Sequence, residues 1–75
     1  MTRLIRITMA NDLREFMQMA TASNYDIGVH AEGNQIADAK SILGLMSLDF
    51  DHPIRVVTDD EHFLKRLDRW AVEEE

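Results

Sequence analysis

The sequence predicts an α+β domain, an open-faced sandwich in which a four-stranded antiparallel sheet carries three helices on one face. Apolar residues recur with alternating strand and helix periods, in the order β-α-β-β-α-β-α. The residues expected on the second face of the strands are mostly polar, so we expect solvent on that face and all helices on the other. These polar residues are Arg6, Thr8, Gly28, His30, Asp38 and Arg55, with Ile36 and Val57 as exceptions. The length predicts one domain, residues 1–75.

The first strand and helix are predicted from a change of period. Residues 3–8 alternate, with Ile5 and Ile7 on the inward side. Over residues 10–23 the apolar stripe follows helical spacing, through Leu13, Phe16, Met17 and Ala20. Asn11 or Asp12 can cap this helix, and Asp12 with Glu15 has the spacing of a capping box.

A hairpin is expected next. Residues 25–31 read as a strand whose inward residues are Ile27, Val29 and Ala31. The turn residues of "EGNQ" follow, and "IADA" is a short return strand in which Ala37 and Ala39 share a face.

A short second helix is predicted from Ser41, which is placed as its N-cap. We expect Ile42, Leu45 and Leu48 on the buried side, and Leu43, Met46 and Ser47 on the other. Gly44 weakens a helix by about 1 kcal/mol relative to alanine, so the helix depends on its packing.

The last strand and helix complete the fold. Residues 54–58 read as a strand, after "DFDHP" ends the preceding helix. Thr58 and Glu61 have the spacing of a capping box. The helix that they begin has the strongest periodicity of the chain, through Phe63, Leu64, Leu67, Trp70 and Ala71.

Composition narrows the function classes. With 14 acidic against 8 basic residues the net charge is −6, which argues against nucleic acid as a partner. There is no cysteine, no run long enough for a membrane span or a signal peptide, and no catalytic triad, paired carboxylates or phosphate loop. We therefore expect a cytoplasmic, non-enzymatic protein without a cofactor or metal. The consecutive residues 59–62 point in different directions, so they are not expected to hold a metal.

One segment carries a family resemblance. "AKSILGLMSL", preceded by "ASNYD" and the hairpin, resembles HPr, the histidine-containing phosphocarrier of the bacterial sugar phosphotransferase system. The match covers residues 19–48 at motif level and the whole chain in element order. The resemblance implies the HPr open-faced sandwich.

The chain departs from that family where the phosphoryl group would be received. HPr proteins have G-I-H-A-R-P at the start of the first helix, whereas this chain has "MANDLRE", after a shorter connection. Asn11 takes the place of the phosphorylated histidine, Leu13 that of the arginine and Arg14 that of the proline. The amide nitrogen of asparagine is not basic and cannot form a useful phosphoramidate. His30, His52 and His62 lie elsewhere, so phosphohistidine transfer is expected to be absent.

Ser41 is the remaining candidate. The resemblance implies that HPr kinase/phosphorylase phosphorylates it and that a transcriptional regulator binds the product, with Lys40, Leu43, Met46 and Ser47 as partner-binding residues. The alternative is that Ser41 acts only as a helix cap in a diverged binding or structural module; an active phosphocarrier that uses another group is a third reading. The chain is expected to be a monomer or a weak homodimer.

Overall fold

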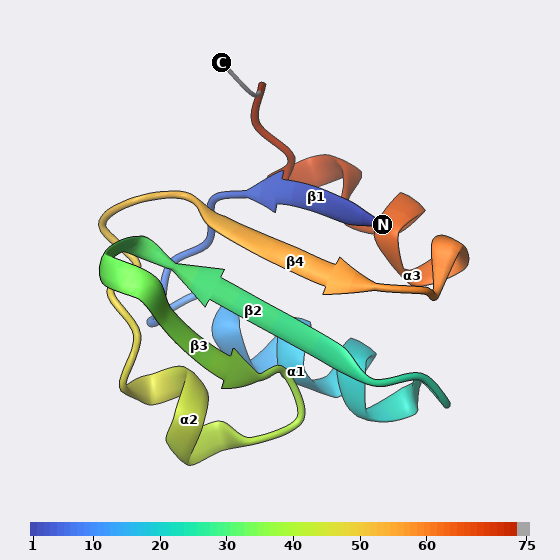
Figure 1. The fold of residues 1–75 in the computed structure, drawn as a ribbon, viewed down its shortest axis with the longest axis horizontal. Coiled ribbons are helices and arrows are strands. Elements are labelled where there is room, and N and C mark those ends of the chain that lie inside the picture. The colour runs from blue at the N-terminus through green and yellow to red at the C-terminus, as the bar shows by residue number, and fades with distance from the viewer. Residues whose placement is uncertain (74–75) are drawn as a thin grey trace.

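The computed structural model describes residues 1–73 and contains the predicted four-stranded antiparallel sheet. Its strands are β1 (Thr2–Ile5), β2 (Ile27–Ala31), β3 (Gln35–Asp38) and β4 (Ile54–Thr58). They lie in the order β1-β4-β2-β3, so β1 and β3 form the two edges (Figure 1). The predicted element order and the α+β class are confirmed. Glu74 and Glu75, at the end of the predicted domain, lie outside the described residues.

Three helices cover one face of this sheet: α1 (Leu13–Ala22), α2 (Ile42–Met46) and α3 (Glu61–Lys65). Single 3-10 turns lie at η1 (Glu32–Asn34) and η2 (Asp68–Trp70). On the opposite face His30 and Asp38 are exposed, which agrees with the expected solvated surface, and Ile36 is 68% exposed. The helices therefore share one core with the inner face of the sheet.

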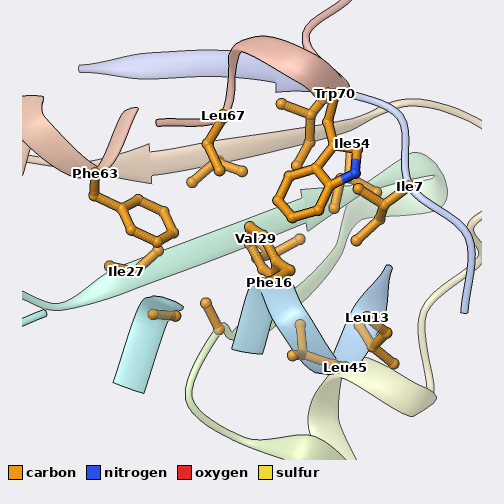
Figure 2. Close-up of a cluster of buried hydrophobic side chains, with 14 of the residues drawn as sticks. Ile7, Leu13, Phe16, Ile27, Val29, Leu45, Ile54, Phe63, Leu67 and Trp70 are labelled. Atoms are coloured by element: carbon orange, nitrogen blue, oxygen red, sulfur yellow. The ribbon is translucent and has the colours of Figure 1, made fainter. Parts of the chain in front are cut away.

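The core is centred on Phe16, whose side chain is fully buried between α1 and the sheet (Figure 2). Its ring meets Phe63 and Trp70 edge-to-face, at centroid distances of 5.9 and 6.2 Å. Val29 and Leu67, also fully buried, come from the sheet and from the segment after α3. Aromatic residues from the C-terminal part of the chain thus pack on Phe16, in the first turn of α1.

The burial predicted for the second helix is wrong at Ile42. Leu45 is fully buried and Leu48 is 6% exposed, but Ile42 is 41% exposed. Ile42, Leu45 and Leu48 are three residues apart, whereas one turn of an α-helix takes about 3.6 residues. Side chains with this spacing therefore do not stay on one face of the helix. Since α2 ends at Met46, Leu48 is reached only after the helix and Ile42 is left at its rim.

The capping box predicted for α1 does not form. The Asp12 carboxylate turns back and accepts hydrogen bonds from the Thr8 backbone N–H at 2.9 Å and the Thr8 hydroxyl at 3.2 Å. Glu15 pairs instead with Arg69 near the C-terminus. The two acidic residues thus bind the segment before α1 and the last turn of the chain.

The capping box predicted for the last helix is also wrong. Thr58 is buried and its hydroxyl donates to the carbonyl of Asp26 at 2.8 Å, so it belongs to the sheet end. Asp60 caps α3 by accepting from the backbone N–H of Phe63 at 3.0 Å. The helix is shorter than predicted, because it stops at Lys65 and the chain continues to η2.

Asp60 also joins α3 to the end of α1. The Ser23 hydroxyl donates to its second carboxylate oxygen at 2.6 Å. This hydrogen bond, followed by that from the Phe63 N–H, lowers the pKa of Asp60. The ionised carboxylate is therefore favoured in the folded chain.

Among the described residues, none of the helices has the length and apolar character needed to cross a bilayer.

Candidate functional site

The segment before α1 is held in a tight turn that fixes Asn11 at the helix start. Thr8 anchors the turn: its carbonyl accepts from the N–H groups of Asp12 and Leu13, at 3.0 and 3.2 Å. The hydroxyl of Thr8 accepts from the Asn11 N–H at 3.3 Å. Asn11 is exposed on this turn, whereas Leu13 is buried in the core.

A groove lies between this turn, α1 and α2, and we call it the α1/α2 groove. It has a volume of about 580 Å³ and is lined by Met9, Ala10, Asn11, Leu13, Arg14, Met17, Ile42 and Met46. Most of these side chains are apolar, and Met9, Ile42 and Met46 are 45%, 41% and 53% exposed. Arg14, also exposed, is the only charged residue in the lining, and within residues 1–73 it makes no salt bridge. Such a surface suits an apolar partner that carries a carboxylate.

Ser41 has the predicted role of N-cap. Its Oγ accepts from the Gly44 N–H at 3.2 Å, and its carbonyl accepts from the Leu45 N–H at 2.9 Å. Gly44 fits closely there, because a Cβ at that position would lie 3.3 Å from the Ser41 Oγ and 3.4 Å from the Ala37 Cβ. Ser41 is therefore half-buried, and its hydroxyl caps the first turn of α2.

The four residues predicted to contact a partner differ in what their side chains bind within the chain. Met46 lines the α1/α2 groove, and Leu43, 79% exposed, projects from the same short helix. Lys40 extends to the end of α1, where its ammonium group donates to the Ser23 carbonyl at 2.8 Å. The Ser47 hydroxyl donates to the carbonyl of Gly44 at 2.6 Å. Leu43, Met46 and Ser47 are thus exposed, while the polar groups of Lys40 and Ser47 also bind the backbone of this chain.

No histidine lines the α1/α2 groove. His30 is exposed on β2, on the sheet face opposite the helices, and His62 lies in the first turn of α3. His52 follows α2, and its Nε2 lies 3.8 Å from a carboxylate oxygen of Glu32. The groove therefore contains neither an imidazole nor another side chain that could accept a phosphoryl group on nitrogen at neutral pH.

Sequence reasoning missed three side chains of this groove as surface residues: Met9, Met17 and Ile42. Met17 and Ile42 were assigned to core stripes, whereas Met17 is only half-buried. For Ile42 the signal is the excess of apolar residues in the short helix: "ILGLM" is apolar on all sides, and a single turn on a sheet cannot bury every side. The sequence carries no such signal for Met9 and Met17.

Within residues 1–73, no cluster of three or more histidine or acidic side chains is placed to hold a metal ion. Comparisons of the chain with protein-family models, curated protein sequences and solved structures found no match.

Proposed function

We propose that this chain is an HPr-like regulatory protein that binds a protein partner and does not carry a phosphohistidine. The observation that carries the proposal is the α1/α2 groove, with exposed apolar side chains and no imidazole. The sequence around Ser41 supplies the link to the phosphotransferase system, and a cytoplasmic location follows from that link. The function is recognition and not catalysis.

The partner is expected to be a transcriptional regulator that presents apolar side chains and a carboxylate. Leu43 and Met46 would supply most of the apolar contact, because they are the most exposed large side chains on α2. Arg14, at the rim, would pair with the carboxylate. Aliphatic and methionine surfaces of this kind adapt to a partner by changing rotamer.

Phosphorylation of Ser41, by a kinase of the HPr kinase/phosphorylase type, would regulate this binding. A phosphoserine adds about −1.5 to −2 charges at neutral pH, two residues before Leu43. Its oxygens can still accept from the Gly44 N–H, so the cap would persist. The nearest lysine in sequence, Lys40, already donates to the Ser23 carbonyl, so the new charge would face the partner largely unneutralised.

The hydrogen bond of the Ser41 hydroxyl to Gly44 favours a second candidate function, a binding module that is not phosphorylated. Ser41 is half-buried, and its Oγ is bonded to the Gly44 N–H and close to the position of a Cβ there. A kinase would have to draw it out of this cap. The alternative is therefore a binding module in which Ser41 serves only the helix and no kinase acts on it.

Treatment of the folded protein with HPr kinase and ATP separates these functions. The regulatory function predicts a mass increase of one phosphoryl group, which Ser41→Ala abolishes. Ser47→Ala is the matched control, because it removes another serine hydroxyl bonded to α2 and should leave the reaction unchanged. An unmodified wild-type chain would favour the constitutive binding module.

Docking is tested separately, by the affinity for an HPr-dependent transcriptional regulator. Leu43→Lys and Met46→Lys should each weaken binding at least tenfold. Ile36→Lys is the matched control, since it makes the same charge change at an exposed residue on the opposite face of the sheet. Equal effects of all three variants would contradict docking through α2.

A further inference from the structure

The two edges of the sheet differ. At β1 the residues after α3 form an isolated antiparallel bridge, between Ile5 and Ala71: the Arg6 N–H donates to the Trp70 carbonyl at 2.8 Å, and the Val72 N–H donates to the Leu4 carbonyl at 3.0 Å. The C-terminal segment thus covers this edge (Figure 1). The other edge is β3, and within residues 1–73 no strand is paired to its outer side.

The register shows which groups of β3 point outward. The Ala39 N–H donates to the Ile27 carbonyl at 2.9 Å, which makes these two residues a hydrogen-bonded pair. Hydrogen-bonded and non-hydrogen-bonded pairs alternate along antiparallel strands. Ile36, opposite His30, is therefore at a non-hydrogen-bonded position, and its N–H and C=O both point away from β2.

Ile36 is also strongly exposed to solvent. It is 68% exposed and lies on the sheet face opposite the helices. Gln35 and Asp38, which flank it on β3, are also exposed, and Ala37 is half-buried against α2. An open edge with an apolar residue at its centre is the surface to which another strand adds.

We propose that this edge binds a second copy of the same chain, by antiparallel pairing of β3 with β3 about a two-fold axis at Ile36. A two-fold axis at Ile36 is possible because the N–H and the C=O of this residue both point outward. The Ile36 N–H of each copy can then donate to the Ile36 carbonyl of the other. The two Ile36 side chains meet on the same face, across the axis. The pairing does not use the α1/α2 groove, because Ile36 lies on the sheet face opposite the helices, although α2 packs against the inner face of β3.

The charges along β3 suit this register. Pairing Ile36 with itself places Asp38 of each copy opposite Asn34 of the other and keeps the two Asp38 carboxylates apart. The edge of β3 is complementary to itself in this register, which a strand of another protein would not need. We therefore expect a second copy of this chain as the partner of β3.

The dimer is expected to be weak. β3 has four residues, and the chain leaves strand geometry at Asn34, where φ is 62°. The interface is therefore far below the roughly 1,200–2,000 Å² of stable complexes, and we expect a Kd of the order of 1 mM. Each copy carries a net charge of −6, so added salt should increase the dimer fraction by screening repulsion.

Sedimentation equilibrium and amide chemical shifts of the full chain, over a concentration series, test the proposal. The expected result is a mass that rises from 8.7 kDa toward twice that value, with shifts confined to residues 34–38. Ile36→Lys should abolish both effects. Leu43→Lys, which makes the same charge change on α2, should leave them intact.

A second variant tests the backbone bonds themselves. Ile36→Pro removes the outward N–H without removing a bond to β2, and the extended φ and ψ of Gln35, −74° and 133°, suit a residue before proline. It should abolish association while the circular dichroism spectrum stays that of wild type. A chain that remains monomeric at 1 mM and high salt, or a dimer that Leu43→Lys disrupts and Ile36→Lys does not, would overturn the proposal.

Discussion

Removal of the Ser41 hydroxyl should destabilise the domain by about 1 kcal/mol, the usual cost of losing an N-cap side chain. The hydroxyl satisfies the Gly44 N–H at 3.2 Å, a partly buried donor that alanine would leave without this acceptor. Urea denaturation of Ser41→Ala measures the loss as a lower midpoint at an unchanged m value. Ser41→Asp should retain the stability, because aspartate caps helices as well as serine does.

Because Ser41 and Gly44 are in close contact, substitutions at the two positions should affect stability in a coupled way. Gly44→Ala gains about 1 kcal/mol of helix propensity, but its Cβ would lie only 3.3 Å from the Ser41 Oγ. We therefore expect the gain to be largely offset in the wild type and largely recovered in the Ser41→Ala background, where that oxygen is gone.

The double-mutant cycle should show a coupling of about 0.5–1 kcal/mol between the two positions. Two additive substitutions, or a Ser41→Ala variant as stable as the wild type, would refute the placement of the hydroxyl in the cap.

Three other substitutions test the core, the acid response and the groove. Phe16→Ala should lower the free energy of unfolding by about 3–5 kcal/mol in urea, because the ring is fully buried among two other aromatic rings. The Ser23 hydroxyl lowers the pKa of Asp60, so the stabilisation by this carboxylate is complete above about pH 4 and is lost as the pH falls through the lowered pKa. Asp60→Asn should therefore flatten the loss of stability measured as the pH falls below about 4, and an unchanged acid transition would contradict this. Asn11→His alone should not confer phosphoryl transfer in an assay with enzyme I and phosphoenolpyruvate, because Leu13, which stands where the HPr proteins that the sequence resembles have an arginine, is buried and supplies no cation; efficient labelling would contradict this.

The order of the longer elements could be predicted because the change of hydrophobic period from α1 to β2 is clear. Leu13, Phe16 and Ala20 are buried at helical spacing on α1, and Ile27 and Val29 are buried at alternate positions on β2. The caps could not be predicted in the same way. The Asp12 carboxylate and the Thr58 hydroxyl can each reach several backbone groups. Which of these groups each side chain binds depends on tertiary contacts that the sequence does not show.

The candidate site was only partly predictable. Ser41 as a cap and Leu43 and Met46 as exposed residues follow from local spacing, and the structure agrees with all three. The hydrogen bonds of Lys40 and Ser47 could not be predicted from local spacing. Lys40 donates to the Ser23 carbonyl at the end of α1, and Ser47 donates to the Gly44 carbonyl in α2. The α1/α2 groove itself arises from two segments about 30 residues apart, so only the fold brings its lining together.

Exposure of the wild-type chain to enzyme I and phosphoenolpyruvate, with an HPr protein as positive control, tests the central claim that the groove has no group able to accept a phosphoryl. The intact mass of this chain should stay unchanged while the control gains one phosphoryl group. An acid-labile phosphoryl group on a nitrogen of this chain would contradict the account.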